Sequence, residues 1–337
     1  MKPEFELFDR RDFFGRVTKA AAVAGLAVSV EPYATAEEKA NPFAYDLSRF
    51  QKTDPKLISY EEMTRWPIPR TGARRLAIGL DDQLLVCAGN YIDALTRSGG
   101  QRLELLLGGP ACCVVQSSDG TIFAGLRDHI ELFDSKGVKL TRWASPGSKA
   151  WFTGLAASET GVFVADAGRR VILHYDRTGK IIGEIGRKDA ARNVPGFVVP
   201  SPFLDLMIHR DGLLRVNNPG RHRVETYTFD GDMETVWGKP TAAIEGFCGC
   251  CNPIAITALA DGRLVTCEKG IPRVKIYSAA GEFESVVAGA ESFPENAHAC
   301  TDLNDCVHGG LDAAVDSDGR IYILDVVANN VRVMKRK

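Results

Sequence analysis

The sequence predicts an all-β fold: a six-bladed β-propeller with four-stranded antiparallel blades. Three observations support this prediction, namely a recurring strand–turn–strand unit, Asp-Gly dipeptides between alternating apolar runs, and a matching third strand after most units. Glycine adopts the positive φ of a tight turn without steric cost, so Asp-Gly between two apolar runs is a strong hairpin signal. Repeats of this kind bury their apolar faces only by stacking side by side, and stacked four-stranded units close into a ring.

The units can be placed along the chain. The clearest copies span 154–166 and 313–325, and a degenerate first copy runs over 76–86. Weaker copies contain Asp119-Gly120, Asp211-Gly212 and Asp261-Gly262. Third strands are expected at 171–175, 224–227, 274–277 and 331–334.

The two ends of the repeat region predict how the ring closes. The last unit stops at Lys337 after three strands, and residues 55–60, ahead of the first unit, have the pattern of the missing fourth strand. Pairing this N-terminal strand with the last blade removes two open sheet edges. We therefore expect the propeller to span 54–337, after a linker over 37–53.

The N-terminus resembles a twin-arginine export signal. Arg10-Arg11 is followed by Phe13-Phe14, an alanine-rich apolar stretch runs over 20–30, and small residues occupy 34–36. This order is typical of a signal peptide, although an amphipathic helix or an uncleaved anchor is the alternative. We expect residues 1–36 to be removed, the protein to be periplasmic or otherwise exported, and no stable membrane span to remain. The resemblance also implies export of a folded protein, often with a cofactor already loaded.

The charge balance argues against nucleic acid as a partner. Lys and Arg number 41 and Asp and Glu 43, which gives a formal net charge of −2. Binding to nucleic acid depends on a basic surface that releases counterions from the phosphate backbone, and no basic run is present. The hydrophobic fraction of 45% suits a globular core instead.

The nine cysteines are distributed unevenly. Three precede the predicted innermost strand of blade five, and two precede that of blade six. Connections between consecutive blades emerge on one face of a propeller, so we expect these five thiols to meet at one rim with two histidines. The residues are Cys248, Cys250, Cys251, Cys300 and Cys306, with His298 and His308.

Three interpretations of this cluster remain open. Four of the thiolates could ligate zinc or a [4Fe–4S] cluster, since Cys248 and Cys251 have the Cys-x-x-Cys spacing. Such a centre would imply electron transfer or redox sensing with an unknown protein or redox partner. Alternatively, disulfides, including Cys300–Cys306, could stabilise a periplasmic binding or scaffold propeller. A thiol–disulfide redox site is the third interpretation, without the usual βαβ context.

Short motifs in the repeats resemble the NHL-repeat propeller superfamily across about 54–337. They are Gly-Leu-Ala at 154–156, Asp-Gly-x-Ile-Tyr at 318–322, Ala-Asp at 165–166 and Arg-Val at 273–274. The Cys-Cys-Asn-Pro at 250–253 is also similar to an uncharacterised subgroup of exported bacterial propellers. The superfamily includes hydrolases, a lyase and purely binding propellers, so the resemblance implies the fold and leaves the function open.

A second set of candidates faces the expected channel. Cys113, Asp205 and Asp312 occupy equivalent repeat positions in alternate blades, so we expect them to face one another. A divalent ion held by the two acids and a neighbour would suit an NHL-type hydrolase or lyase, a further alternative. Arg74-Arg75 at the entry of blade one is expected to be a solvated pair that could attract an anion to the channel mouth.

Overall fold

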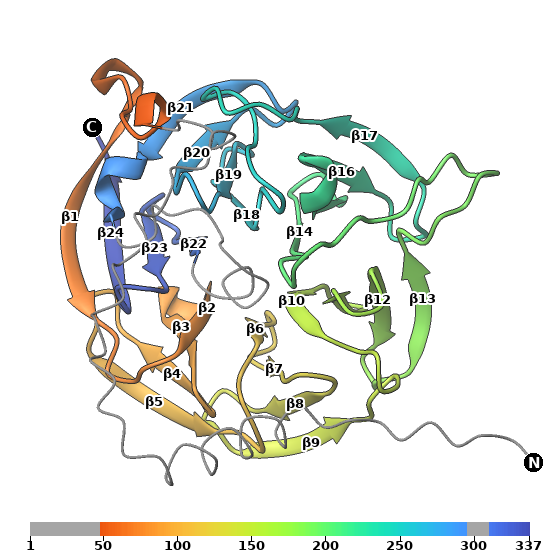
Figure 1. Cartoon of the computed structure of the whole chain (residues 1–337). Coiled ribbons are helices and arrows are strands. Elements are labelled where there is room, and N and C mark those ends of the chain that lie inside the picture. Colours follow the sequence, from red (N-terminus) through yellow and green to blue (C-terminus); the bar gives the residue numbers. More distant parts are fainter. Residues whose placement is uncertain (1–47, 295–309) are drawn as a thin grey trace, which may run out of the picture. The chain divides into compact units, whose positions relative to one another are not determined.

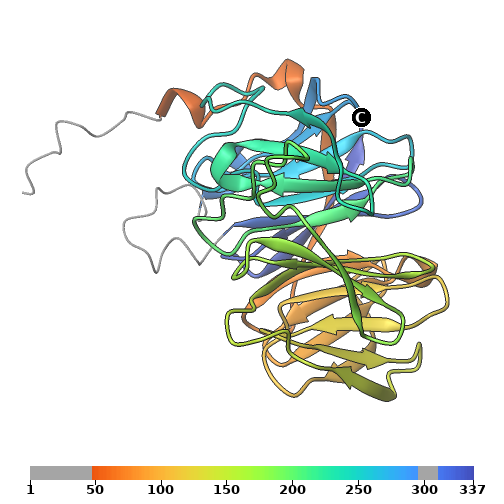
Figure 2. The same ribbon diagram turned by 90° about the vertical axis from the view of Figure 1, so that its right-hand side faces the viewer.

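The computed structural model describes residues 48–294 and 310–337 and confirms the predicted six-bladed propeller. Strands β1 to β24 form six separate four-stranded antiparallel sheets. The sheets are arranged as blades around a common axis, with one strand of each blade nearest the centre (Figure 1). In the side view the strands of neighbouring blades lie one above another (Figure 2).

Each blade runs from an innermost to an outermost strand. Blade 1 contains β2 (Ala73–Ile78), β3 (Leu84–Ala88), β4 (Tyr91–Leu95) and β5 (Gln101–Leu106); blade 2 contains β6 (Cys113–Gln116), β7 (Ile122–Gly125), β8 (Ile130–Phe133) and β9 (Lys139–Trp143). Blade 3 contains β10 (Phe152–Ala157), β11 (Gly161–Asp166), β12 (Val171–Asp176) and β13 (Ile181–Ile185); blade 4 contains β14 (Leu206–Ile208), β15 (Leu214–Asn218), β16 (Arg223–Tyr227) and β17 (Met233–Trp237). Blade 5 contains β18 (Ala255–Ala258), β19 (Leu264–Cys267), β20 (Val274–Tyr277) and β21 (Phe283–Ala288); blade 6 contains β22 (Leu311–Val315), β23 (Ile321–Asp325), β24 (Asn330–Arg336) and β1 (Tyr60–Pro67).

The Asp-Gly turns have the predicted geometry. Gly212 and Gly262 adopt φ of +78° and +94°, a region that favours glycine. The preceding Asp211 and Asp261 each accept a hydrogen bond from the backbone N–H two residues further on, at 3.0 Å. Such Asp turns satisfy the backbone locally, which is why this part of the fold could be recognised from sequence alone.

The N-terminal strand closes the ring as predicted, but the predicted residue range was wrong. The closing strand is β1, from Tyr60 to Pro67, and not 55–60. Residues Pro55–Leu57 form a 3-10 turn instead, because the Asp54 carboxylate accepts a hydrogen bond from the Lys56 N–H at 2.9 Å and Pro55 cannot donate to a strand partner.

β1 pairs antiparallel with β24 along its whole length. The register runs from Tyr60 opposite Arg336 to Pro67 opposite Asn330, with a bulge between Glu62 and Thr64. Just before the strand, the Ser59 N–H donates to the Val286 carbonyl of blade 5 at 3.0 Å. The N-terminal segment therefore joins the first, the last and the fifth blades.

The remaining short elements are 3-10 turns. They are Ser48–Phe50, Leu80–Asp82, Pro219–Arg221 and Ala290–Ser292. No helix among the described residues is long and apolar enough to cross a membrane.

The closing strand gives a first prediction. A chain that begins at Arg70 lacks β1 and leaves β24 as an open edge. We expect its free energy of unfolding to fall by about 5 kcal/mol, since roughly half a dozen ladder hydrogen bonds and the burial of Tyr60 are lost. Urea unfolding followed by circular dichroism measures this loss, with a chain that begins at Ser48 as the control. Equal midpoints for the two chains would show that β1 does not hold the ring closed.

Candidate functional site

The innermost strands bring six matching residues around the channel. In each blade this residue lies opposite the same position of the second strand, as Arg75 lies opposite Cys87 and Ala255 opposite Cys267. The six residues are Arg75, Cys113, Gly154, Asp205, Ala255 and Asp312. The ring therefore contains one cation, two acids, one thiol and two small residues.

Arg75 crosses the channel and joins both acids. Its Nη1 lies 2.9 Å from Asp312 of the neighbouring blade 6 and 3.3 Å from Asp205 of blade 4, on the far side. Asp205 fits because the matching position of the adjacent blade 3 is Gly154, where an added Cβ would lie 2.5 Å from the Asp205 carboxylate. The arginine side chain is 13% exposed, so the expectation of a solvated pair was wrong for Arg75. Arg74 is exposed.

Backbone donors hold the two carboxylates in place. The Leu76 N–H donates to Asp312 at 2.8 Å, and the Ile256 N–H donates to Asp205 at 3.0 Å. Burial opposes the charge of Arg75, but the two carboxylates outweigh this penalty and raise its pKa above the ordinary value. Burial also raises the pKa of Asp205 to about 6, although Arg75 opposes this shift. The acids are thus engaged by an arginine, which does not suit the alternative of a channel-bound divalent ion.

Cys113 lies beside this group as a neutral thiol. Its side chain is buried, and burial raises its pKa well above the ordinary value. The thiols Cys87 and Cys267 are fully buried in the core and behave in the same way. These three cysteines therefore act as small apolar residues that pack around the channel.

Arg75 separates two cavities. On the face where the connections between blades arrive, a cavity of about 330 Å³ is lined by residues from all six blades, which we call the mouth cavity. Its lining includes Ala73, Cys112, Phe152, Phe203, Ile254 and Leu311, one from each blade in order. On the opposite face a cavity of about 350 Å³ contains Asp205 and Asp312 in its lining. Arg75 lines both cavities.

The mouth cavity combines aromatic walls with positive charge. Trp151 and Phe203 line it, and the Arg127 guanidinium lies 3.5 Å from the centroid of the Trp151 ring. The Lys269 ammonium lies 4.5 Å from the centroid of Phe203. Arg74 and Arg75 also belong to the described lining, whereas no Asp or Glu does. The cavity is therefore apolar on its walls and electropositive.

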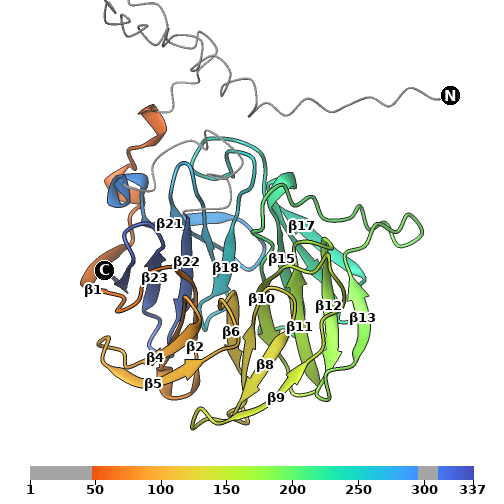
Figure 3. The same cartoon turned by 60° about the horizontal axis from the view of Figure 1, so that its bottom comes forward.

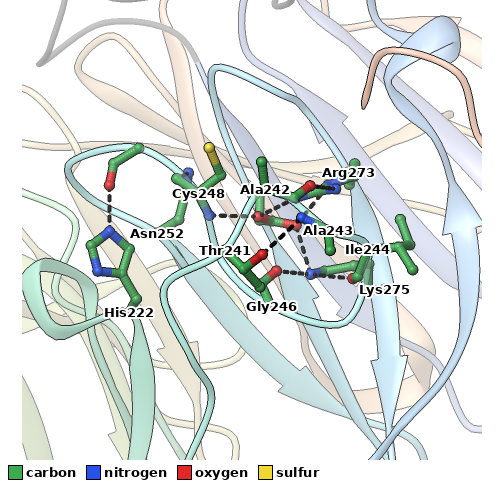
Figure 4. Close-up of polar contacts among 12 residues, drawn as sticks. His222, Thr241, Ala242, Ala243, Ile244, Gly246, Cys248, Asn252, Arg273 and Lys275 are labelled. Carbon is green, nitrogen blue, oxygen red and sulfur yellow. Dashed lines mark hydrogen bonds and ion pairs between the residues drawn. The ribbon is translucent and has the colours of Figure 1, made fainter. Parts of the chain in front are cut away.

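A second feature of this face is the segment from β17 to β18, which carries three of the predicted site cysteines. It rises above the strands (Figure 3). Two buried cations bind the backbone of this segment (Figure 4). Lys275 of β20 donates to the carbonyls of Ile244 and Gly246 at 3.0 and 2.6 Å. Arg273, in the turn before β20, donates to the Ala242 carbonyl at 3.1 Å.

Glu268 forms an ion pair with each of these two cations. Its carboxylate lies 2.9 Å from Arg273 and 2.8 Å from Lys275, and all three side chains are almost completely buried. Burial lowers the pKa of Lys275 to about 8, although Glu268 opposes this shift. The Cys248 N–H also points at Glu268, at 3.4 Å, so the start of the cysteine motif is anchored to the same carboxylate.

The three cysteines of the segment differ in environment. Cys248 is half-buried, Cys250 is exposed and Cys251 is buried, and the Sγ atoms of Cys250 and Cys251 lie 3.5 Å apart. Burial, and then Glu268, raises the pKa of Cys248. The loop is further fixed by Asn252, whose side chain exchanges two hydrogen bonds of 2.9 Å with the Lys269 backbone, and by His222, which contacts the Gly249 carbonyl (Figure 4).

The residues of blade 6 that were predicted to join these thiols lie outside the described residues; they are Cys300, Cys306, His298 and His308. Within residues 48–294 and 310–337, no three His, Cys, Asp or Glu side chains gather in a way that could hold a metal ion. No disulfide joins two of the described cysteines.

Sequence reasoning missed the buried charges that shape this face. Glu268, Arg273 and Lys275 follow one another closely in blade 5, and charged residues in a strand normally point to solvent. One available signal was that Lys275 lies between two apolar residues of a strand that is covered on both sides by neighbouring blades. The aromatic lining at Trp151 and Phe203 comes from connecting segments, which carry no repeat pattern.

Comparisons with known proteins identify structures with a similar fold but do not identify a function. No protein-family model and no curated protein matches the chain. A streptogramin B lyase structure is similar over 82% of this chain and 97% of its own, with 16% identity and a TM-score of 0.57. A catalytically inactive virginiamycin B lyase from Staphylococcus aureus with quinupristin matches over 82% and 100%, with 14% identity and a TM-score of 0.54.

A structural genomics protein of unknown function from Bacteroides thetaiotaomicron is also similar, over 82% of this chain and 76% of its own, at 12% identity and a TM-score of 0.58. At such low identity these likenesses show a shared propeller fold. Since one fold hosts many unrelated activities, the function has to be argued from the site itself.

Proposed function

We propose that this protein is a small-molecule-binding propeller and that its ligand occupies the mouth cavity. The observation that carries this proposal is the cavity itself: about 330 Å³, lined by apolar and aromatic side chains from all six blades, with Arg75 as its floor. Cavities of roughly 300–1,000 Å³ with mostly apolar walls and a few polar groups are the usual form of ligand sites in proteins.

The lining favours binding over covalent catalysis. The candidate nucleophiles among the described lining residues are Cys112 and Thr153. Burial raises the pKa of Cys112, although Arg74 and Arg127 oppose this shift, so its thiol is protonated at neutral pH. The Thr153 hydroxyl is already used, because it donates to the Leu204 carbonyl at 2.6 Å. The similar virginiamycin B lyase solved with quinupristin supports only the general point that propellers accommodate small organic ligands.

The cavity gives a second prediction. Val327 lines the mouth cavity but is 43% exposed, so Val327→Trp should fold and fill part of the space. Thermal shift with a library of small heterocyclic compounds should find some that raise the Tm of the natural protein and not of this variant. Val138→Trp is the matched control, because Val138 is 59% exposed and lies outside the cavity lining. Compounds that stabilise all three proteins equally, or none at all, would contradict the proposal.

A thiolate metal centre is the second candidate function, in which the protein would serve electron transfer or redox sensing after export. The specific observation is that Cys250 and Cys251 place their Sγ atoms 3.5 Å apart on a loop anchored by buried charges. Two sulfurs on one tetrahedral zinc, each at about 2.3 Å, would lie ~3.8 Å apart. The described thiols offer at most part of a ligand set, so this candidate depends on Cys300 and Cys306.

Metal analysis gives the third prediction. If the centre exists, protein purified without oxygen should contain stoichiometric zinc or iron, and iron–sulfur should add visible absorption. The double variant Cys248→Ser, Cys251→Ser should lose most of that metal. Cys112→Ser is the control, because Cys112 is half-buried on another connection and should leave the metal content unchanged. Metal-free natural protein, or equal metal in all three samples, would end this candidate.

A further inference from the structure

We propose that the ligand of the mouth cavity is a small aromatic anion, a carboxylate or sulfonate, whose acid group is bound by the Nε–Nη2 edge of Arg75 while its ring lies beside Trp151 and Phe203. This inference rests on the proposed function and specifies the chemical class of the ligand. It is carried by the hydrogen bonding of Arg75 together with the charges and rings that line the cavity.

The two ion pairs of Arg75 use one nitrogen. Both Asp205 and Asp312 are within ion-pair distance of Nη1, at 3.3 and 2.9 Å. Among the described residues, the hydrogen bonds of this guanidinium all start from Nη1, which leaves Nε and Nη2 for a ligand. These two nitrogens form the edge of the guanidinium that binds the two oxygens of a carboxylate or sulfonate side by side. Arg75 lines the mouth cavity, so a ligand there can reach this edge.

The charges are divided between the two cavities. Asp205 and Asp312 line the opposite cavity, whereas the described lining of the mouth cavity includes Arg74 and Arg75 without an acid. An anion in the mouth cavity therefore meets the guanidinium before it meets the carboxylates. Low local dielectric strengthens such an interaction relative to the same pair in water.

The electrostatic surroundings of Trp151 and Phe203 suit an electron-rich ring with a negative substituent. An aromatic face is normally negative and repels an anion. Here Arg127 covers Trp151 and Lys269 covers Phe203, so each ring carries a cation on one of its faces. These cations offset the negative ring potential and add to the attraction for an acid group. Apolar side chains complete walls that suit the ring itself, among them Phe152, Ile254 and Leu311.

The fourth prediction tests the role of charge. Isothermal titration calorimetry with 2-naphthoate and the uncharged 2-naphthamide should show about tenfold tighter binding of the carboxylate, the size expected for one charge-assisted bidentate contact. Arg75→Lys keeps the charge but removes the fork, so it should lose most of this preference. Arg97→Lys should retain it, because Arg97 also joins acidic residues, such as Asp318 at 2.6 Å, but outside the mouth cavity.

The outcomes separate this inference from the proposed function. Equal affinity for the two probes, or an unchanged preference in Arg75→Lys, would overturn the role of Arg75 and leave the cavity as a binding site. If neither probe binds, while other compounds still raise the Tm of the natural protein and not that of Val327→Trp, the proposed ligand class is wrong and the mouth cavity remains a binding site. If Arg75→Lys does not fold, Arg74→Gln replaces it as the test, because Arg74 is exposed. This variant is expected to bind 2-naphthoate roughly threefold more weakly and to bind 2-naphthamide with unchanged affinity. No effect in that variant would also count against the inference.

The fifth prediction concerns pH. Asp205 faces Arg75, Asp312 and the thiols of Cys113 and Cys267, and burial raises the pKa of both thiols, so they stay neutral between pH 5 and about 8. When Asp205 is ionised, its negative charge beside Arg75 repels an anionic ligand bound to that guanidinium. Burial raises the pKa of Asp205 to about 6, so protonation below pH 6 removes that repulsion.

Affinity for naphthalene-2-sulfonate, whose charge does not change in this range, should therefore fall by roughly threefold to tenfold from pH 5 to about 7.5. Calorimetry at a series of pH values measures this fall. Asp205→Asn, which keeps the shape of the side chain, should flatten the profile. A flat profile for the natural protein, or an affinity that rises with pH, would contradict the placement of the anion beside the Arg75–Asp205 pair.

Discussion

Closure of the ring is the constraint on which the rest of this structure depends. A propeller blade cannot bury both faces alone, so every blade is stable only between two neighbours. The pairing of β1 with β24 supplies the last neighbour contact and fixes the six inner strands around one axis. Only then do Asp205 and Asp312, which lie 130 and 237 positions after Arg75 in the sequence, come within reach of its guanidinium. The mouth cavity is thus a consequence of closure, because its described lining comes from all six blades.

The sequence predicted those parts of the fold that are decided locally. Asp-Gly turns and alternating strands satisfy their own backbone groups within a few residues, so the six blades could be recognised without any long-range information. The predicted position of the closing strand was wrong by several residues, because Asp54 and Pro55 form a local turn that a strand pattern does not reveal. The repeat alignment also singled out Asp205 and Asp312 as unusual. It could not supply their partner, since Arg75 lies in the most degenerate unit and the contact crosses the channel.

The paths of the connections between blades could not be predicted from the sequence. The cysteine segment has no repeat pattern, and its path is set by Lys275 of β20 and by Arg273 in the turn before it, which donate to its carbonyls. A buried lysine is tolerated there because Glu268 and two backbone oxygens replace the water it has lost. In sequence this lysine alternates with apolar residues as a solvent-facing one would, so only the cover that neighbouring blades give to both sides of the strand could have indicated its burial. The sequence likewise does not reveal the position of Trp151 and Phe203 at the cavity, which depends on how the connecting segments cross the inner strands.

Arginine suits position 75 for a reason that links structure to function. A buried cation in the channel has to satisfy two acids from different blades, and a lysine could do this as a point charge. A guanidinium does it with a single nitrogen and keeps a second donor edge. Stabilising the ring and binding a ligand therefore use different atoms of one side chain. Because Asp205 shares that guanidinium and has a pKa raised by burial, the charge of the cavity floor depends on the protonation of a structural residue. In a channel held together in this way, stability and ligand affinity are coupled, since both depend on the same pair of carboxylates.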